Sequence, residues 1–428
     1  MKKVNILYVF LLIYIIKCQQ KEKEQQDLNY TNWGLDNGIE FSVPIELLSE
    51  KFIAGRDIER KEEILRIPYD ITYNINKSLD LLNSNELKSQ YEKFVKLDVP
   101  TYEPHHINLQ KEEIFLSYIL YLIQHEPELY QKTKFYEKYK PYISSLKKYL
   151  PKSPLFYTND QIEYLQGTYL GKFHNRIKKL FQDEINILKN ESFYNKTIDF
   201  KDFVQYRLST INKGLEVLGH ISMIPFLNNF NRDYMYYNAL FNIDKEGNIK
   251  IISKRKIRKG ESIILISPKR ANVERMIFEG ELNSYLVNYK ENYLIPAFSP
   301  GLFYKYNITN IKLFNGYFIN FAELKYEEKA INLYKEYKEL FNGDEEDEWA
   351  YGVLLENVDY YREYVEHFIK DRLNKEFTDD FDKKIIERAL KGEENVLKRA
   401  KELVRNKLQQ LRKIKNDKEN KKNKNDEL

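Results

Sequence analysis

The chain has 428 residues, of which 42% are apolar, 14% aromatic and 31% charged. It is about three times as long as a typical domain, and its apolar fraction suffices for buried cores, so wholesale disorder is excluded. The formal net charge is +4, but residues 398–428 alone carry twelve basic and five acidic side chains. Because this charge lies at one chain end and not on a folded face, the sequence argues against nucleic acid as the partner.

The first 18 residues have the pattern of a secretory signal peptide. A basic start precedes the apolar run 4–16, and the polar stretch 17–26 follows. A bilayer-spanning helix needs about 20 apolar residues, so this run is shorter than a span and fits the core of a signal peptide. We expect cleavage after Cys18 and no transmembrane span in the mature chain, with an uncleaved anchor as the alternative.

Cysteine and sequon usage bear on the compartment. Cys18 is the only cysteine, so a mature chain lacking it would have neither a thiol nucleophile nor a cysteine-ligated metal. Glycosylation sequons predict a glycoprotein. They start at Asn29, Asn76, Asn190, Asn195 and Asn307.

The chain ends in Asn425-Asp-Glu-Leu428, which is similar to the Lys-Asp-Glu-Leu retrieval signal. The lysine-rich segment 412–428, which includes this ending, is predicted to be a flexible tail that would expose the signal. A signal-like start and a retrieval-like end together predict the lumen of the endoplasmic reticulum.

Strand patterns open the folded part of the chain. Short β-type runs at 39–43, 51–54 and 63–67 are separated by Gly55 and ended by Pro68. Three further runs, at 238–243, 249–253 and 262–267, are joined by glycine-containing turns and predict a β-meander.

Helical patterns fill the rest. Residues 79–218 are predicted to be mainly helical, and helices resume beyond about residue 294. The clearest apolar stripe recurs at helical spacing and predicts a buried helix face. It consists of Ile114, Phe115, Tyr118, Ile119, Leu122 and Ile123. The fold class is therefore α+β, with a β core, a long helical insertion and an all-α C-terminal unit.

This order of elements resembles the SET-domain protein methyltransferases of the Rubisco large-subunit lysine methyltransferase type. The resemblance implies a SET domain at 27–290 with a helical insertion at about 79–218, and a helical substrate-binding domain at 294–411. The passages that carry it are Trp33 with Asn37-Gly38, residues 54–68, residues 135–168, Ile224-Pro-Phe-Leu-Asn-Asn229, residues 260–272 and residues 388–397.

Members of that family transfer a methyl group from S-adenosylmethionine to a lysine or histidine nitrogen of a protein. The resemblance implies this cofactor and a protein or peptide partner. The chemistry depends on alignment, because the nitrogen lone pair must face the sulfonium in a narrow channel. A channel tyrosine, a glycine-rich turn and an Asn-His pair are the family's main site features.

The sequence departs from the family at each of these features. Leu47-Leu-Ser-Glu-Lys51 replaces the glycine-rich approach to the cofactor, where side chains would block a close backbone contact. Gly214 aligns with a cofactor-contacting arginine. In the cofactor-binding Asn-His pair, Asn228 is retained but Asn229 replaces the histidine.

The tyrosine position shows the largest chemical change. A gapless alignment places Ser267 there, and a serine hydroxyl is shorter and far less acidic than a phenol. A different register, or another tyrosine folding into the channel, would restore the phenol. The candidates for that role are Tyr234, Tyr236, Tyr237 and Tyr289.

Other chemistries find no support in the sequence. No HExxH motif, phosphate-binding loop, dinucleotide-binding glycine motif or GxSxG motif is present. We therefore expect no metal site, and structural or solvent-facing roles for the histidines. The basic run Lys254-Arg-Lys-Ile-Arg-Lys259 is interpreted as a solvated turn, with a face for an acidic partner as the alternative.

Two functions compete on this basis. The chain is either a protein lysine or histidine N-methyltransferase that uses S-adenosylmethionine, or an inactive relative that binds a peptide or protein between the SET core and the C-terminal helices. The changes at the cofactor and channel positions favour the inactive relative.

Overall fold

The computed structural model describes residues 29–48, 51–100, 107–146, 153–163, 165, 169–191, 193–194, 196–233, 236–266, 272–280, 294–296 and 318–320, with scattered positions between 352 and 418. The chain divides into two compact units. The first comprises Met1–Pro151 and Leu180–Lys269, and the second comprises Lys152–Lys179 and Arg270–Leu428.

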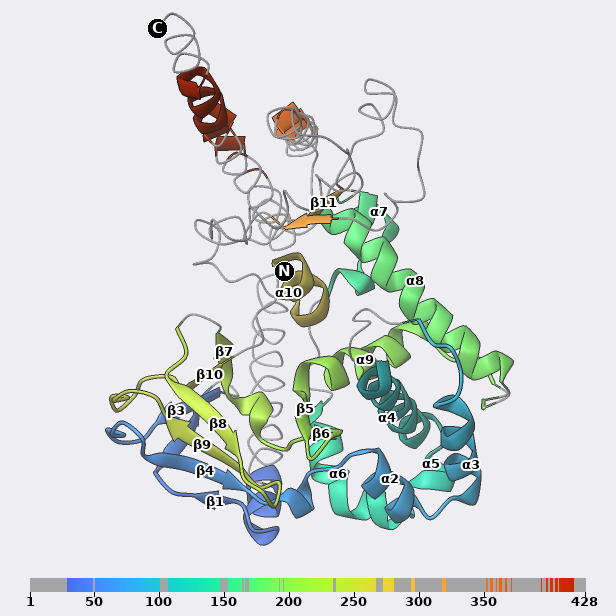
Figure 1. Ribbon diagram of the computed structural model, residues 1–428. Coiled ribbons are helices and arrows are strands. Elements are labelled where there is room, and N and C mark those ends of the chain that lie inside the picture. The colour runs from blue at the N-terminus through green and yellow to red at the C-terminus, as the bar shows by residue number, and fades with distance from the viewer. Residues whose placement is uncertain are drawn as a thin grey trace, which may run out of the picture. The chain divides into compact units, whose positions relative to one another are not determined.

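A mixed sheet forms one half of the first unit (Figure 1). Its strands, in sheet order, are β1 (Glu40–Phe41), β4 (Glu63–Ile67), β9 (Ile249–Ser253), β8 (Ala239–Ile243), β10 (Ile264–Ile266) and β7 (Asn231–Asp233). Strand β10 pairs in parallel with both β7 and β8, whereas the other neighbours are antiparallel. Two antiparallel hairpins accompany the sheet, β2 (Ile45–Leu48) with β3 (Lys51–Ala54) and β5 (Gly214–Val217) with β6 (His220–Met223).

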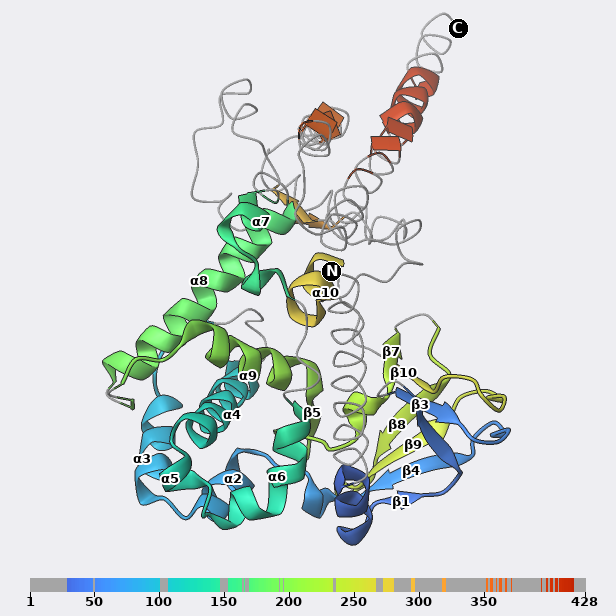
Figure 2. The ribbon, with the colours of Figure 1, turned by 180° about the vertical axis from the view of Figure 1, so that it is seen from behind.

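Helices form the other half of the first unit, as Figure 2 shows from behind. They are α2 (Ile75–Leu82), α3 (Asn85–Phe94), α4 (Ile107–His125), α5 (Pro127–Tyr130), α6 (Lys134–Leu146), the later part of α8 (Tyr169–Asn190), and α9 (Phe200–Lys213), with 3-10 turns η1 (Tyr69–Ile71) and η5 (Leu227–Asn229). Helix α4 is the central helix, because residues 110–123 are buried on every side and not only along the predicted stripe. Side chains at the start of α2 and α9 cap them, Asn74 accepting from the Lys77 amide and Asp199 from the Asp202 amide.

The second unit contains η4 (Pro154–Phe156), α7 (Asn159–Glu163), the start of α8, α10 (Asn272–Glu279) and helical positions between 352 and 418. Ser153 Oγ donates to the carbonyl of Ile277, and the rings of Phe173 and Phe278 meet edge to face, so α10 packs on the earlier segment. Strands β11 (Leu294–Pro296) and β12 (Phe318–Asn320) form a short antiparallel pair within the region predicted to be helical. Among the described residues, no helix has the length and hydropathy needed to cross a membrane.

The strand predictions agree closely with the structure, whereas the region predicted to be helical extends too far along the chain. Predicted strands 51–54, 63–67 and 249–253 match β3, β4 and β9 residue for residue. Helix α9 ends at Lys213, whereas the helical pattern was expected to run to residue 218. The cause is a two-residue turn at Leu218 and Gly219, both with positive φ, which reverses the chain into β6.

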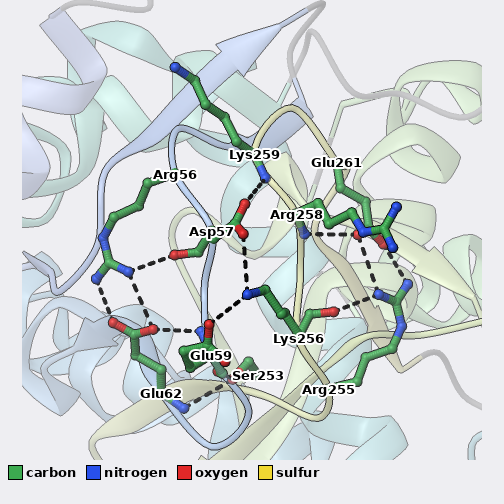
Figure 3. A network of polar contacts seen from close by, with 10 residues as sticks. All are labelled: Arg56, Asp57, Glu59, Glu62, Ser253, Arg255, Lys256, Arg258, Lys259 and Glu261. Carbon is green, nitrogen blue, oxygen red and sulfur yellow. Dashed lines mark hydrogen bonds and ion pairs between the residues drawn. The ribbon is translucent and has the colours of Figure 1, made fainter.

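Two turns in the first unit have the same structure, and each residue of the second lies 199 positions after its counterpart in the first (Figure 3). In the first turn, Arg56 forms an ion pair with Glu62 and donates to the carbonyl of Asp57 at 2.7 Å. In the second, Arg255 forms an ion pair with Glu261 and donates to the carbonyl of Lys256 at 2.8 Å. The run predicted as a solvated basic turn is thus largely this second turn.

The charges of the two turns differ where the turns meet. Lys256 of the second turn lies 3.3 Å from an Asp57 carboxylate oxygen and 2.9 Å from one of Glu59 (Figure 3). The Lys259 amide also donates to Asp57 at 2.9 Å, and this hydrogen bond, with the Lys256 contact, lowers the pKa of Asp57. Complementary charge therefore joins the two copies of the turn.

Candidate functional site

The turn that precedes β7 has a strained backbone. Phe226 has a φ of +65°, a left-handed conformation that is unusual for a bulky side chain. The turn continues through η5, where the Asn229 amide donates to the carbonyl of Phe226 at 3.0 Å and Asn229 is buried. The predicted Asn228–Asn229 pair is therefore held next to a strained residue, which is a common feature of functional sites.

The N-terminal helix, described from residue 29 to residue 36, holds this turn in place. The rings of Tyr30 and Phe226 stack with centroids 4.2 Å apart, and the Phe226 amide donates to the Tyr30 hydroxyl at 2.8 Å. A Cβ at position 34 would lie 2.6 Å from the Phe226 ring, so only glycine fits there. Tyr30 and Gly34 thus determine where the turn lies.

Three cationic side chains come from three separate elements, and the charges of two of them act on the third. Lys213 is the last residue of α9, Arg232 lies in β7 and Lys51 begins β3. Lys213 is only 6% exposed, and Arg232 Nη1 donates to the carbonyl of Asn212 at 2.7 Å. We call Lys51, Lys213 and Arg232 the cationic cluster.

The electrostatics of Lys213 reflect its burial and its charged neighbours. The pKa of Lys213 is lowered to about 7, first because the side chain is buried and then because of the charges on Arg232 and Lys51. The carbonyl end of α9 favours cations, and this offsets part of the repulsion.

The residue that the alignment placed at the arginine position lies directly after Lys213. The alignment assigned Gly214 to the position of the cofactor-contacting arginine, but the structure gives Gly214 a packing role, since a Cβ there would lie 2.6 Å from the carbonyl of Thr210. The cation at this end of the helix is its neighbour, Lys213. The missed signal was a basic residue directly before the glycine that ends the helix.

The remaining predicted site residues are placed as follows. Asn228 is the middle residue of η5, and Ser267, Tyr234 and Tyr289 lie outside the described residues. Tyr236 is 56% exposed, and Tyr237 has the ammonium group of Lys254 3.6 Å from its ring centre. Neither Tyr236 nor Tyr237 has the buried placement expected of a channel phenol.

A buried charged network, also missed at the sequence level, joins three helices of the first unit. Arg207 of α9 makes two hydrogen bonds to Glu184 of α8, at 2.8 and 3.1 Å, and lies 3.6 Å from Glu113 of α4. Arg207 is fully buried, and burial raises the pKa of Glu184 against the opposing effect of Arg207. The role of the network is to fix the packing of the helices.

The described histidines have protein partners. His220 Nδ1 lies 2.8 Å from a Glu112 carboxylate oxygen and its Nε2 lies 3.3 Å from Asn76 Nδ2, while His125 lies 3.3 Å from Asp202. No group of three or more His, Cys, Asp or Glu side chains in the described part of the chain is arranged to hold a metal ion.

Comparison with solved structures shows what this architecture is. The SET domain of LSMT bound to lysine and AdoHcy matches with a TM-score of 0.56 over 90% of this chain and 92% of that chain, at 12% identity. Rubisco LSMT bound to AdoMet matches with a TM-score of 0.55 over 90% and 92%, at 13% identity. The chain has the SET fold.

The likeness extends over nearly the whole chain, as the resemblance predicted. A further LSMT SET-domain structure, bound to methyllysine and AdoHcy, covers 90% of this chain and 93% of that chain with a TM-score of 0.56 at 14% identity. No family model matches the chain. No curated protein matches it either. The likeness is therefore one of structure, with little sequence in common.

Proposed function

We propose that this SET-fold protein binds a protein or peptide partner and transfers no methyl group. The departures at the family's cofactor and channel positions carry the proposal. Asn229 replaces the histidine of the Asn-His pair, and Ser267 stands at the tyrosine position of the gapless alignment.

Local sterics support the same conclusion. Leu48 of β2 pairs with Lys51 of β3, and residues 47–51 contain no glycine. Glycine is the residue that allows a close backbone approach to a cofactor. Together with the serine at position 267, its absence supports a site that does not hold the methyl donor.

The test is calorimetric titration of the mature protein with S-adenosylmethionine and with S-adenosylhomocysteine. We expect no heat of binding for the methyl donor at millimolar concentration. Micromolar binding of the donor, or transfer of labelled methyl groups to any protein in an extract, would refute the proposal.

The second candidate is a protein N-methyltransferase. The observation that favours it is the match over 90% of the chain to structures that hold AdoMet, AdoHcy and lysine. It predicts that the titration gives donor binding and that Asn228 and Asn229 variants weaken it, whereas the binding-protein proposal predicts no donor signal to weaken.

We propose the lumen of the endoplasmic reticulum as the location, from the signal-like start and the ending Asn425-Asp-Glu-Leu428. The sequon asparagines Asn29, Asn76 and Asn190 are exposed and accessible to a glycosyltransferase. A tagged chain expressed in secretory cells should shift in mass with an N-glycosidase. Deletion of residues 425–428 should release it into the medium, and an unchanged distribution would contradict retention.

A further inference from the structure

The two matching turns are references for each other, because they form the same bonds with partly different residues (Figure 3). In both, an arginine pairs with a glutamate six positions later, and an isoleucine is buried at the centre. The glutamate also accepts a backbone amide at the tip of the turn, from Glu59 at 2.7 Å in the first turn and from Arg258 at 3.0 Å in the second. These shared residues are what the turn needs in order to form, and the charges at the other positions are free to differ.

Three cationic residues lie along one side of the turn pair. The Lys61 amide donates to the Ser253 carbonyl at 2.9 Å, and the Glu62 amide donates to the Ser253 hydroxyl at 3.0 Å. The first turn therefore lies beside the end of β9. Arg60 and Lys61 belong to this part of the first turn, and Lys254 directly follows Ser253. We call Arg60, Lys61 and Lys254 the basic patch.

The charges of the basic patch are not neutralised within the part of the chain that the structure describes. All three residues are exposed, and none of them forms an ion pair with another described residue. The carboxylates of the first turn are already paired, Asp57 and Glu59 with Lys256 and Glu62 with Arg56. The positive charge of the patch is therefore open to a partner.

The opposite side of the turn pair carries less positive charge. There the Gly260 amide donates to the Ala54 carbonyl at 2.7 Å, in the same way as the equivalent amide on the first side. The positions equivalent to the basic patch hold one lysine and two glycines, which are Lys259, Gly260 and Gly55. Since both sides form the same backbone bonds, the structure of the turn does not explain why three cations stand on one of them.

We propose that the basic patch is a docking surface for an acidic segment of a protein or peptide. This inference rests on the proposed function only for the class of the partner, which is a protein or peptide. The cations are exposed and lie on two neighbouring segments, so each can meet a separate carboxylate along an acidic chain. The Lys254 ammonium lies 3.6 Å from the centre of the Tyr237 ring, which limits its movement and lowers the entropy lost when a carboxylate binds.

The test is fluorescence anisotropy of a labelled oligoglutamate peptide titrated with the full chain. Arg60→Gln combined with Lys254→Gln should weaken binding roughly fivefold or more, because two charge contacts are lost. Arg258→Gln combined with Lys259→Gln is the matched control, since it also removes one exposed arginine and one exposed lysine, and it should change binding less than about twofold at physiological salt. Lys61→Gln should weaken binding as well, and it covers a folding defect in the first double variant.

The outcomes are separable. No oligoglutamate binding at millimolar concentration, or equal losses in the two double variants, would overturn the docking surface and leave the proposed function intact. Tighter binding of a duplex DNA oligonucleotide or of phosphatidylserine vesicles than of the peptide would also overturn it, because the partner would then belong to another class. Donor binding in the S-adenosylmethionine titration, with oligoglutamate binding still dependent on Arg60 and Lys254, would instead overturn the proposed function and leave the docking surface.

Discussion

Ile58 and Ile257 exchange both of their backbone hydrogen bonds, at 2.8 and 2.9 Å, although 199 positions separate them in the sequence. Both are fully buried at the centre of the two matching turns. The hydrogen bonds around them also occur in matching pairs: the Lys61 amide donates to the Ser253 carbonyl, and the Gly260 amide donates to the Ala54 carbonyl. The two turns therefore stabilise each other through reciprocal backbone hydrogen bonds.

Both turns contain one residue with a left-handed backbone, which is a lysine in the first turn and a glycine in the second, and this gives a matched pair of variants. Lys61 has a φ of +68°, and its counterpart Gly260 has a φ of +78°. A left-handed conformation costs a non-glycine residue about 1 kcal/mol, of which the greater flexibility of glycine in the unfolded chain offsets a part.

We expect Lys61→Gly to raise the free energy of unfolding by roughly 0.5 kcal/mol and Gly260→Lys to lower it by roughly 1 kcal/mol. Urea denaturation followed by circular dichroism measures both. A destabilised Lys61→Gly variant would show that the Lys61 side chain contributes more than its backbone strain costs.

The buried Arg207–Glu184 pair predicts strongly non-additive effects. Arg207→Met should destabilise the first unit by about 3–5 kcal/mol, because it leaves the buried Glu184 carboxylate without its cationic partner. Adding Glu184→Leu should recover most of this loss. Chemical denaturation of both variants gives the values, and Arg56→Met in the exposed Arg56–Glu62 pair is the control, expected to cost far less.

A double variant no more stable than Arg207→Met would contradict this account. It would mean that the guanidinium acts mainly through Glu113, which lies 3.6 Å away, or through packing on the Phe181 ring.

Lys213 predicts how stability depends on pH. Its pKa is about 7 in the folded chain and 10.5 as the ordinary value, so between these limits the unfolded chain binds more protons than the folded chain. Stability therefore rises as the pH increases from 7 towards 10.5, by up to about 1.4 kcal/mol per pH unit from this group. Lys213→Met should be more stable than the parent at pH 7, and its advantage should shrink as the pH rises.

Urea midpoints at several pH values check this prediction, with Lys245→Met as a control for the same substitution at an exposed position. If the stability difference between Lys213→Met and the parent stays constant with pH, burial and the neighbouring charges do not lower the pKa of Lys213 in the folded chain.

The sequence predicted the parts of the fold that local pattern determines. Strands β3, β4 and β9 follow from alternating apolar residues bounded by Gly55 and Pro68, and the SET fold followed from the order of elements. The positions that were missed depend on contacts between distant residues. The burial of Arg207 needs Glu184, 23 residues earlier, and the packing role of Gly214 appears only when the carbonyl of Thr210 is seen beside it.

Tyr30 predicts how the strained turn is maintained. Tyr30→Phe keeps the ring that stacks on Phe226 but removes the hydroxyl that accepts the Phe226 amide at 2.8 Å. The buried amide would then lack its partner, so we expect a loss of about 1–3 kcal/mol in the free energy of unfolding. The measurement is denaturation combined with hydrogen exchange, in which the Phe226 amide should exchange faster than its neighbours in β6.

Gly34→Ala would disturb the packing of the N-terminal helix on Phe226, because its Cβ would lie 2.6 Å from the Phe226 ring. Tyr136→Phe on α6 is the matched control, since that hydroxyl makes no hydrogen bond within the described residues. If Tyr30→Phe and Tyr136→Phe cost the same, the turn must be held by its packing against Phe52 and not by the N-terminal helix. In that case the φ of +65° at Phe226 would be maintained by the sheet alone.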